Sequence, residues 1–156
     1  MLVCCDQAEP SPDLVAWTPT IESIRYLDVH PVLPEGSPDT LLHSYRALLV
    51  PLLLNSALCA MKLQPRPNPP LAVKYTTRAL NINDYELSPT DKGKALYRRA
   101  LAAIALKDED DAFQDLQAAN TIVPDDVAIK AELTKLKGKQ KEKREKEKKA
   151  YKNMFG

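Results

Sequence analysis

Two cations one helical turn apart carry the clearest chemistry in this sequence. Lys94 and Arg98 lie within segment 94–100, whose alanine, leucine and arginine residues favour a helix. A spacing of four residues puts both side chains on one helix face. Ammonium and guanidinium groups form charge-assisted hydrogen bonds with carboxylates. The pair therefore predicts a binding site for a carboxylate-bearing peptide rather than a catalytic centre.

The residues near this pair leave alternatives open. Lys94 and Arg98 could also be ordinary solvated charges, which is the usual state of these residue types. Arg99 points about 100° away from Arg98 on a helix and is predicted to be a surface charge. Asn55 is intrinsically unfavourable inside a helix. It is predicted to contact the backbone or carboxylate of a peptide, and a local polar contact is its alternative.

The sequence around the cations has the length of a known structural repeat. Ala100, Ala112, Leu116 and Ala119 take the small and large packing positions of two helices, and Pro124 closes the unit. The unit spans about 34 residues, which is the period of a tetratricopeptide repeat. One such helix pair cannot bury its apolar face alone, so the pattern predicts stacked neighbours and a concave groove.

A second copy of this pattern lies upstream. Ala57 matches the small position of the first helix, and Ala72 and Ala79 match those of the second helix. The alignment requires additional residues in two connections, where extra length is tolerated. Asn55 and Arg98 then occupy the same position of successive repeats, and both are predicted to face the concave surface.

The predicted fold is all-α. Tetratricopeptide repeats would form a partial right-handed superhelix, followed by a long charged C-terminal helix. The predicted domains are an irregular N-terminus, a partial repeat domain with a remnant of repeat one and full repeats two and three, and a charged helical extension, over residues 1–20, 21–136 and 137–156. Helices are predicted over 21–29, 40–63, 71–82, 91–106, 110–122 and 125–151.

The prolines and short polar residues predict where these helices begin. Ser37 or Asp39 is predicted to cap the helix over 40–63, and Pro51 is predicted to kink it. The prolines between 65 and 70 predict a stiff turn. Thr90 or Asp91 is predicted to cap the helix with the two cations. Pro124 is predicted to end one helix pair and to lie in the first turn of the last helix.

Composition excludes several classes of protein. The net charge of +1 gives no overall field towards nucleic acid or membrane, and no apolar run is long enough to cross a bilayer. Three cysteines fit a reducing compartment, and the N-terminus lacks the pattern of a signal peptide, so a cytoplasmic location is expected. The isolated His30 and His43 predict no catalytic role. No metal site and no cofactor are predicted.

The C-terminal segment is strongly basic. Residues 137–152 contain nine Lys or Arg and three Glu, which predicts a solvated helix. Binding to calmodulin or to a chaperone surface is an alternative. Nucleic acid is a less favoured alternative because no aromatic residue lies among the lysines before Tyr151. Tyr151, Met154 and Phe155 form an apolar end that could dock on a partner.

Segments 52–57, 94–100 and 149–155 together resemble the large immunophilins. The resemblance is to their tetratricopeptide-containing cyclophilins, of the peptidyl-prolyl isomerase D type, in a fungal form. It implies a carboxylate clamp that holds the acidic C-terminal tail of the 90-kDa heat-shock chaperone, with the 70-kDa chaperone as a second candidate. Asn55, Lys94 and Arg98 match clamp positions of the second and third repeats.

The chain also departs from that family. The family's first-repeat helix with a Lys and an Asn has no counterpart, and neither has the cyclophilin domain with its catalytic arginine. The resemblance therefore implies a chaperone-docking module with a partial clamp and without isomerase activity. A peptidyl-prolyl isomerase is the alternative function that the family suggests.

Overall fold

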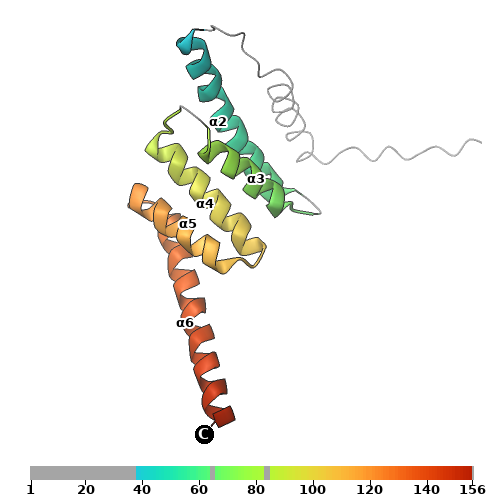
Figure 1. Ribbon diagram of the computed structural model, residues 1–156, viewed down its shortest axis with the longest axis vertical. Coiled ribbons are helices and arrows are strands. Elements are labelled where there is room, and N and C mark those ends of the chain that lie inside the picture. Colours follow the sequence, from blue (N-terminus) through green and yellow to red (C-terminus); the bar gives the residue numbers. More distant parts are fainter. Residues whose placement is uncertain (1–37, 64–65, 83–84, 156) are drawn as a thin grey trace, which may run out of the picture. The chain divides into compact units, whose positions relative to one another are not determined.

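A computed structural model of the chain describes residues 38–63, 66–82 and 85–155 (Figure 1). Within these ranges every regular element is a helix, which confirms the all-α prediction and fits a tetratricopeptide-like fold. The predicted irregular segment 1–20 and the helix over 21–29 lie outside the described residues. The helices are α2 (Asp39–Lys62), α3 (Pro69–Leu80), α4 (Pro89–Ala105), α5 (Glu109–Ile122) and α6 (Val127–Phe155).

The helices fall into two compact units. Helices α2 and α3 belong to the unit Met1–Tyr85, and α4, α5 and α6 belong to the unit Glu86–Gly156. Helix α2 packs against α3, α4 against α5, and α5 against α6. The superhelix and the three domain boundaries expected from the sequence stay predictions.

The α2–α3 pair is held together by small buried residues. Ala57, Ala72 and Ala79 are fully buried, as the repeat alignment predicts, and Leu53 is fully buried beside them. Small side chains at these positions let two helix backbones approach closely. Thr76 is also buried, and its hydroxyl donates to carbonyl oxygens of its own helix turn, at 2.8 and 3.0 Å. A buried hydroxyl is therefore satisfied within α3 itself.

The α4–α5 pair shows the same pattern of burial. Ala100, Ala112, Leu116 and Ala119 are all fully buried, so the predicted packing positions of this repeat are confirmed. The turn between the helices begins at Lys107, whose φ of 66° is in the left-handed region. Two backbone bonds, from the amides of Lys107 and of the following aspartate to carbonyls of the last turn of α4, close it as a Schellman motif.

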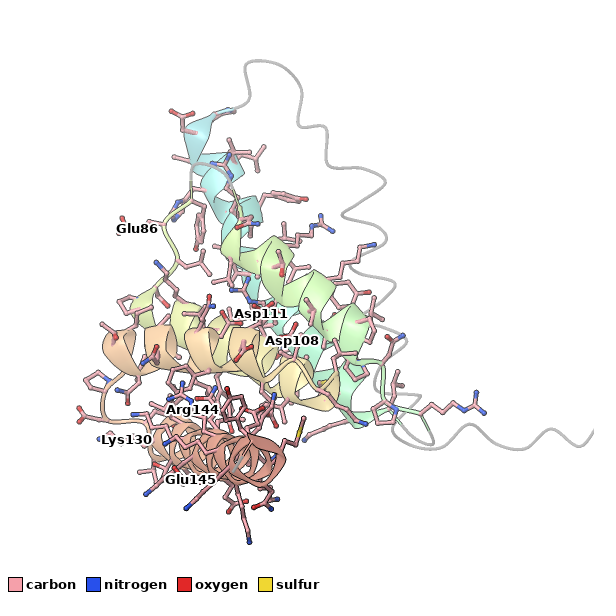
Figure 2. The ribbon with its side chains drawn as sticks, turned by 60° about the horizontal axis from the view of Figure 1, so that its bottom comes forward. Glu86, Asp108, Asp111, Lys130, Arg144 and Glu145 are labelled. Carbon is pink, nitrogen blue, oxygen red and sulfur yellow. The ribbon has the colours of Figure 1, made fainter. Side chains whose placement is uncertain are left out.

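Helix α6 has an apolar first part and a charged second part. Ile129 and Leu136 are 2% and 1% exposed, and they anchor the helix where it packs against α5. Every side chain over 141–154 is exposed, and in Figure 1 this part of α6 runs on beyond α5. Figure 2 looks almost along α6 and shows its charged side chains spreading away from the helix axis. The solvated C-terminal helix is thus confirmed over these residues.

Helix α4 begins two residues earlier than predicted, and neither Thr90 nor Asp91 caps it. Ser88 is the N-cap, and its Oγ accepts a bond of 3.1 Å from the backbone amide of Asp91. Pro89 takes the first helical position, where its missing N–H needs no partner. The serine before the proline, rather than the residues after it, therefore starts the helix.

Three other predicted starts also need correction. Asp39 makes no side-chain cap at α2, where Pro38 is the N-cap residue, and Ser37 lies outside the described residues. Helix α3 begins at Pro69 and is capped by Asn68, so the last two prolines of the expected stiff turn are helical. Pro124 precedes α6 instead of lying in its first turn, because Asp126 accepts from the amides of the following turn, at 2.8 and 3.2 Å.

Helix α2 is long and apolar on average, although no unbroken apolar run in the sequence is long enough to cross a bilayer. By length and composition alone its 24 residues would suffice to cross a membrane. This is weak support for a span, because core helices of soluble proteins have the same property. The part of α2 from Leu49 onwards contributes to the core, where Leu49, Val50, Leu53 and Leu54 are buried.

A candidate carboxylate-binding face on helix α4

Helix α4 presents its two predicted binding cations away from its buried face. Lys94 is exposed and Arg98 is half-buried. The next residue, Arg99, is turned towards α5, and helix geometry separates it from Arg98 by about 100°. Lys94 and Arg98 are only about 40° apart around the helix axis, so α4 carries them on one face. Two cations on one helix face are compatible with the predicted carboxylate site, which stays a prediction.

Lys94 has one acidic neighbour on its own helix. Its Nζ lies 3.7 Å from Oδ1 of Asp91, and both side chains are substantially exposed, 54% for the lysine and 39% for the aspartate. The other carboxylate oxygen of Asp91 accepts a bond of 2.8 Å from Oγ of Ser88. An exposed pair of this kind contributes at most about 1 kcal/mol. Lys94 therefore stays accessible to a stronger anionic ligand.

Arg99 is not the surface charge that the sequence predicted. Its guanidinium donates two hydrogen bonds to the carboxylate of Asp115 on α5. Nε donates to Oδ2 at 2.7 Å, and Nη2 donates to Oδ1 at 2.6 Å. Asp115 is buried, and the arginine side chain is only 28% exposed. Paired oxygens match the planar fork of an arginine, and the two bonds reinforce each other. Arg99 therefore fastens α4 to α5.

Two groups on α4 have shifted protonation equilibria. The hydrogen bond with Asp115 raises the pKa of Arg99 against the opposing effect of burial, and the charges of Asp115 and Asp111 add to the rise. Burial also raises the pKa of Tyr97, and the carboxylates of Glu132 and Asp126 raise it further. Arg99 is therefore a permanent cation, and the Tyr97 phenol keeps its proton near neutral pH.

Asn55 is the third predicted site residue. It lies on α2 with its side chain exposed, so it is available for a polar contact. It belongs to the unit Met1–Tyr85, whereas Lys94 and Arg98 belong to the other unit. A clamp that includes all three residues stays a prediction.

The residue that sequence reasoning missed is Asp115. It stands three residues after Ala112 and four before Ala119, directly on the buried stripe of α5. A carboxylate on such a stripe requires a partner, because burying an unpaired charge is very costly. That spacing could have shown from the sequence that Asp115 needs a cationic partner, but not that the partner is Arg99.

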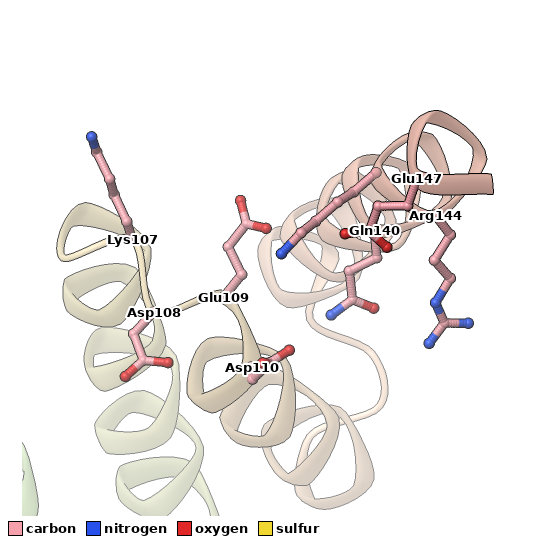
Figure 3. A pocket seen from close by; sticks show the side chains of 8 residues that line it. Lys107, Asp108, Glu109, Asp110, Gln140, Arg144 and Glu147 are labelled. Carbon is pink, nitrogen blue, oxygen red and sulfur yellow. The ribbon is translucent and has the colours of Figure 1, made fainter. Parts of the chain in front are cut away.

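A polar cleft lies between the α4–α5 turn and α6 (Figure 3). Its volume is about 270 Å³, and its walls bring acidic residues at the start of α5 opposite basic residues of α6. One ion pair links the two helices beside it, from Lys139 Nζ to Glu109 Oε1 at 3.9 Å. The cleft is lined by charges of both signs and is mostly polar, unlike the mostly apolar pockets that bind small molecules.

Other candidate chemistry is sparse in the described part of the chain. His43 lies 5.3 Å from the ring of Tyr85, centroid to centroid, which gives it a packing contact. Over residues 38–63, 66–82 and 85–155, no three His, Cys, Asp or Glu side chains are grouped so that they could hold a metal ion.

Comparison with known proteins connects the chain to one group. No protein-family model matches it. The peptidyl-prolyl cis-trans isomerases D of two strains of Cryptococcus neoformans are 48% identical to it over 136 residues, and that of Mycosarcoma maydis is 34% identical over 145 residues. Each match covers 86% of this chain but 36% of the relative, so the chain spans about a third of the length of these relatives. It is thus homologous to part of the fungal peptidyl-prolyl cis-trans isomerases D.

Proposed function

We propose that this chain is a docking module that binds the acidic C-terminal end of a partner protein. The observation that carries the proposal is the pair of cations on one face of α4, with Lys94 well exposed. Arg99 fixes α4 against α5 from another side of the helix. A rigid helix that presents two cations has little ordering cost when a carboxylate binds.

The resemblance to the large immunophilins suggests the partner. We propose that it is the acidic tail of the 90-kDa heat-shock chaperone, with the 70-kDa chaperone as the second candidate, in the cytoplasm. Asn55 would add a polar contact to the charge supplied by Lys94 and Arg98. Each charge-assisted hydrogen bond would contribute about 1.5–3 kcal/mol where it is shielded from water.

Calorimetric titration of an acidic chaperone-tail peptide into the full chain tests the proposal. We expect Lys94→Ala and Arg98→Ala each to weaken binding by at least tenfold, which about 1.4 kcal/mol would produce. Lys92→Ala is the matched control, because Lys92 is an exposed lysine of the same helix about 200° around the axis from Lys94. Unchanged affinity in both test variants would refute the assignment.

Isomerase activity is the alternative that the names of the relatives raise. The matched region is only 36% of each relative, so most of each isomerase has no counterpart in the match. We therefore propose that the chain does not isomerise prolyl bonds. A proline-isomerisation assay on the purified chain should give the uncatalysed rate, and a rate above it would show that a catalytic site is present.

The exposed charged part of α6 supports a second candidate function. All described side chains over 141–154 are exposed, and Tyr151 and Met154 are 68% and 74% exposed. This segment could bind calmodulin or, less favourably, nucleic acid. A chain ending at Gly138 separates the two functions: it should keep carboxylate-peptide binding under our main proposal and lose partner binding under the second.

A further inference from the structure

Asp91 holds a fixed position beside the proposed binding cation Lys94. It is the third residue of α4, where its backbone amide donates to Oγ of the N-cap Ser88 at 3.1 Å. The hydroxyl of Ser88 donates back to Oδ2 of Asp91 at 2.8 Å. These reciprocal bonds are a variant of the capping box and limit the motion of the carboxylate.

The second oxygen of this carboxylate faces Lys94. Oδ1 of Asp91 lies 3.7 Å from Nζ of Lys94. A peptide carboxylate that binds Lys94 has to approach the same ammonium group, and the negative charge of Asp91 opposes its approach. The chain thus carries its own carboxylate beside the ammonium group that a ligand carboxylate would bind.

We propose that Asp91 is an internal competitor that sets the affinity and the selectivity of Lys94 for acidic chain ends. The inference rests on the proposed function of α4. A ligand that binds through a single carboxylate gains little free energy, because it has to displace Asp91 from Lys94. A ligand that also engages Arg98 compensates for the lost pair. Asp91 is therefore a specificity-determining residue of this site.

Helix α5 supplies a matched control position. Asp111 is the third residue of α5, and its amide is bonded by the N-cap Asp108, as the amide of Asp91 is bonded by Ser88. The residue three positions after Asp111 is Gln114, whereas Lys94 stands three positions after Asp91. Asp111→Asn therefore removes the same charge at the same helix position without freeing a lysine.

The test compares Asp91→Asn with Asp111→Asn in the full chain. An acidic chaperone-tail peptide is titrated and the dissociation constants are compared. An exposed ion pair of this kind predicts about two- to fivefold tighter binding in Asp91→Asn. Asp111→Asn should change affinity by less than half of that. In a Lys94→Ala background the gain from Asp91→Asn should vanish, because the competed cation is absent.

The outcomes separate the two proposals. Tighter binding in Asp91→Asn but not in Asp111→Asn supports both the docking function and the competitor. Binding that is detectable only in Asp91→Asn also supports both. Wild-type binding that depends on Lys94 but is unchanged or weaker in Asp91→Asn overturns the competitor and leaves the docking function standing. Absence of binding in the wild type and in Asp91→Asn overturns the docking function and the competitor with it. Circular dichroism melting of each variant confirms that α4 is intact.

Discussion

The two helix pairs share one register but differ in the contacts beside their small residues. When Ala57 is aligned with Ala100, Ser56 falls at the position of Arg99. In α4–α5 that position makes a two-bonded ion pair across the helices, and in α2–α3 it holds a buried hydroxyl without a hydrogen-bond partner among the described residues. Both pairs therefore need small residues that let the two backbones approach closely. At the aligned position, only the α4–α5 pair adds an ion pair between its helices.

The second helices of the two pairs, α3 and α5, also differ at an aligned buried position. Aligning Ala72 with Ala112 and Ala79 with Ala119 puts Thr76 at the position of Leu116, and both are fully buried. The leucine fills this position with apolar volume, whereas the threonine fills it with a hydroxyl bonded to its own helix. The α4–α5 pair should therefore be more sensitive to loss of a side chain at this position.

The largest expected effect is at Leu116. Leu116→Ala should lower the free energy of unfolding by about 2–5 kcal/mol, because it leaves a cavity in the core on the buried face of α5. At the aligned position, Thr76→Val should change it by less than about 1 kcal/mol, because the lost hydroxyl bonds lie within one turn of α3. Urea unfolding followed by circular dichroism measures both. Equal losses would contradict the difference between the pairs.

The next largest effect is at the ion pair. Asp115→Ala should cost about 1.5–3 kcal/mol, because Arg99 then keeps its charge in a partly buried site without its partner. The aligned counterpart, Ser56→Ala, should leave stability unchanged or raise it, because that hydroxyl makes no bond within the described structure. Residue-level amide exchange should show faster opening of α4 and α5 in Asp115→Ala. Unaltered exchange would mean that the pair does not fasten these helices.

A smaller effect is expected where α4 has a glycine and α2 has the buried Val50. A Cβ on Gly93 would lie 2.6 Å from Cγ2 of Val123, and valine is stiff at χ1. Gly93→Ala should therefore destabilise by about 1–3 kcal/mol, the usual cost of overpacking. Gly138→Ala meets nothing within 4 Å and should stabilise α6 by about 0.5–1 kcal/mol. Thermal melting compares the two, and a gain at both sites would exclude the close contact.

The smallest expected effect is on the pH dependence of stability. It distinguishes the two pairs, because α4 has the titratable Tyr97 where α2 has Leu54. Burial and two carboxylates raise the pKa of Tyr97 above its ordinary value of 10.0 in the folded chain. The resulting stabilisation is fully present below about pH 10 and is lost as pH rises through the raised pKa. Stability should thus fall less steeply above pH 10 in Tyr97→Phe than in the wild type. Identical pH slopes would contradict the shift.

Sequence reasoning was most accurate where packing follows a repeat period. The buried alanines of both pairs and Leu116 were predicted correctly, since their spacing defines one face of each helix. Helix starts were predicted less well, because several short polar residues compete for each cap and the winner depends on the local backbone. Ser88 and Asn68 cap helices that begin with prolines, which the sequence placed in the preceding turns.

The sequence by itself determined that the chain is helical, which faces are apolar, and that Lys94 and Arg98 share one side of a helix. These properties depend on residues a few positions apart, so helix periodicity suffices to fix them. Only the tertiary structure decided that Arg99 is an internal fastener and not a surface charge. Its partner is 16 residues away, across a turn whose left-handed Lys107 sets the approach of α5. Contacts of that range arise from the packing of whole helices, which no local pattern encodes.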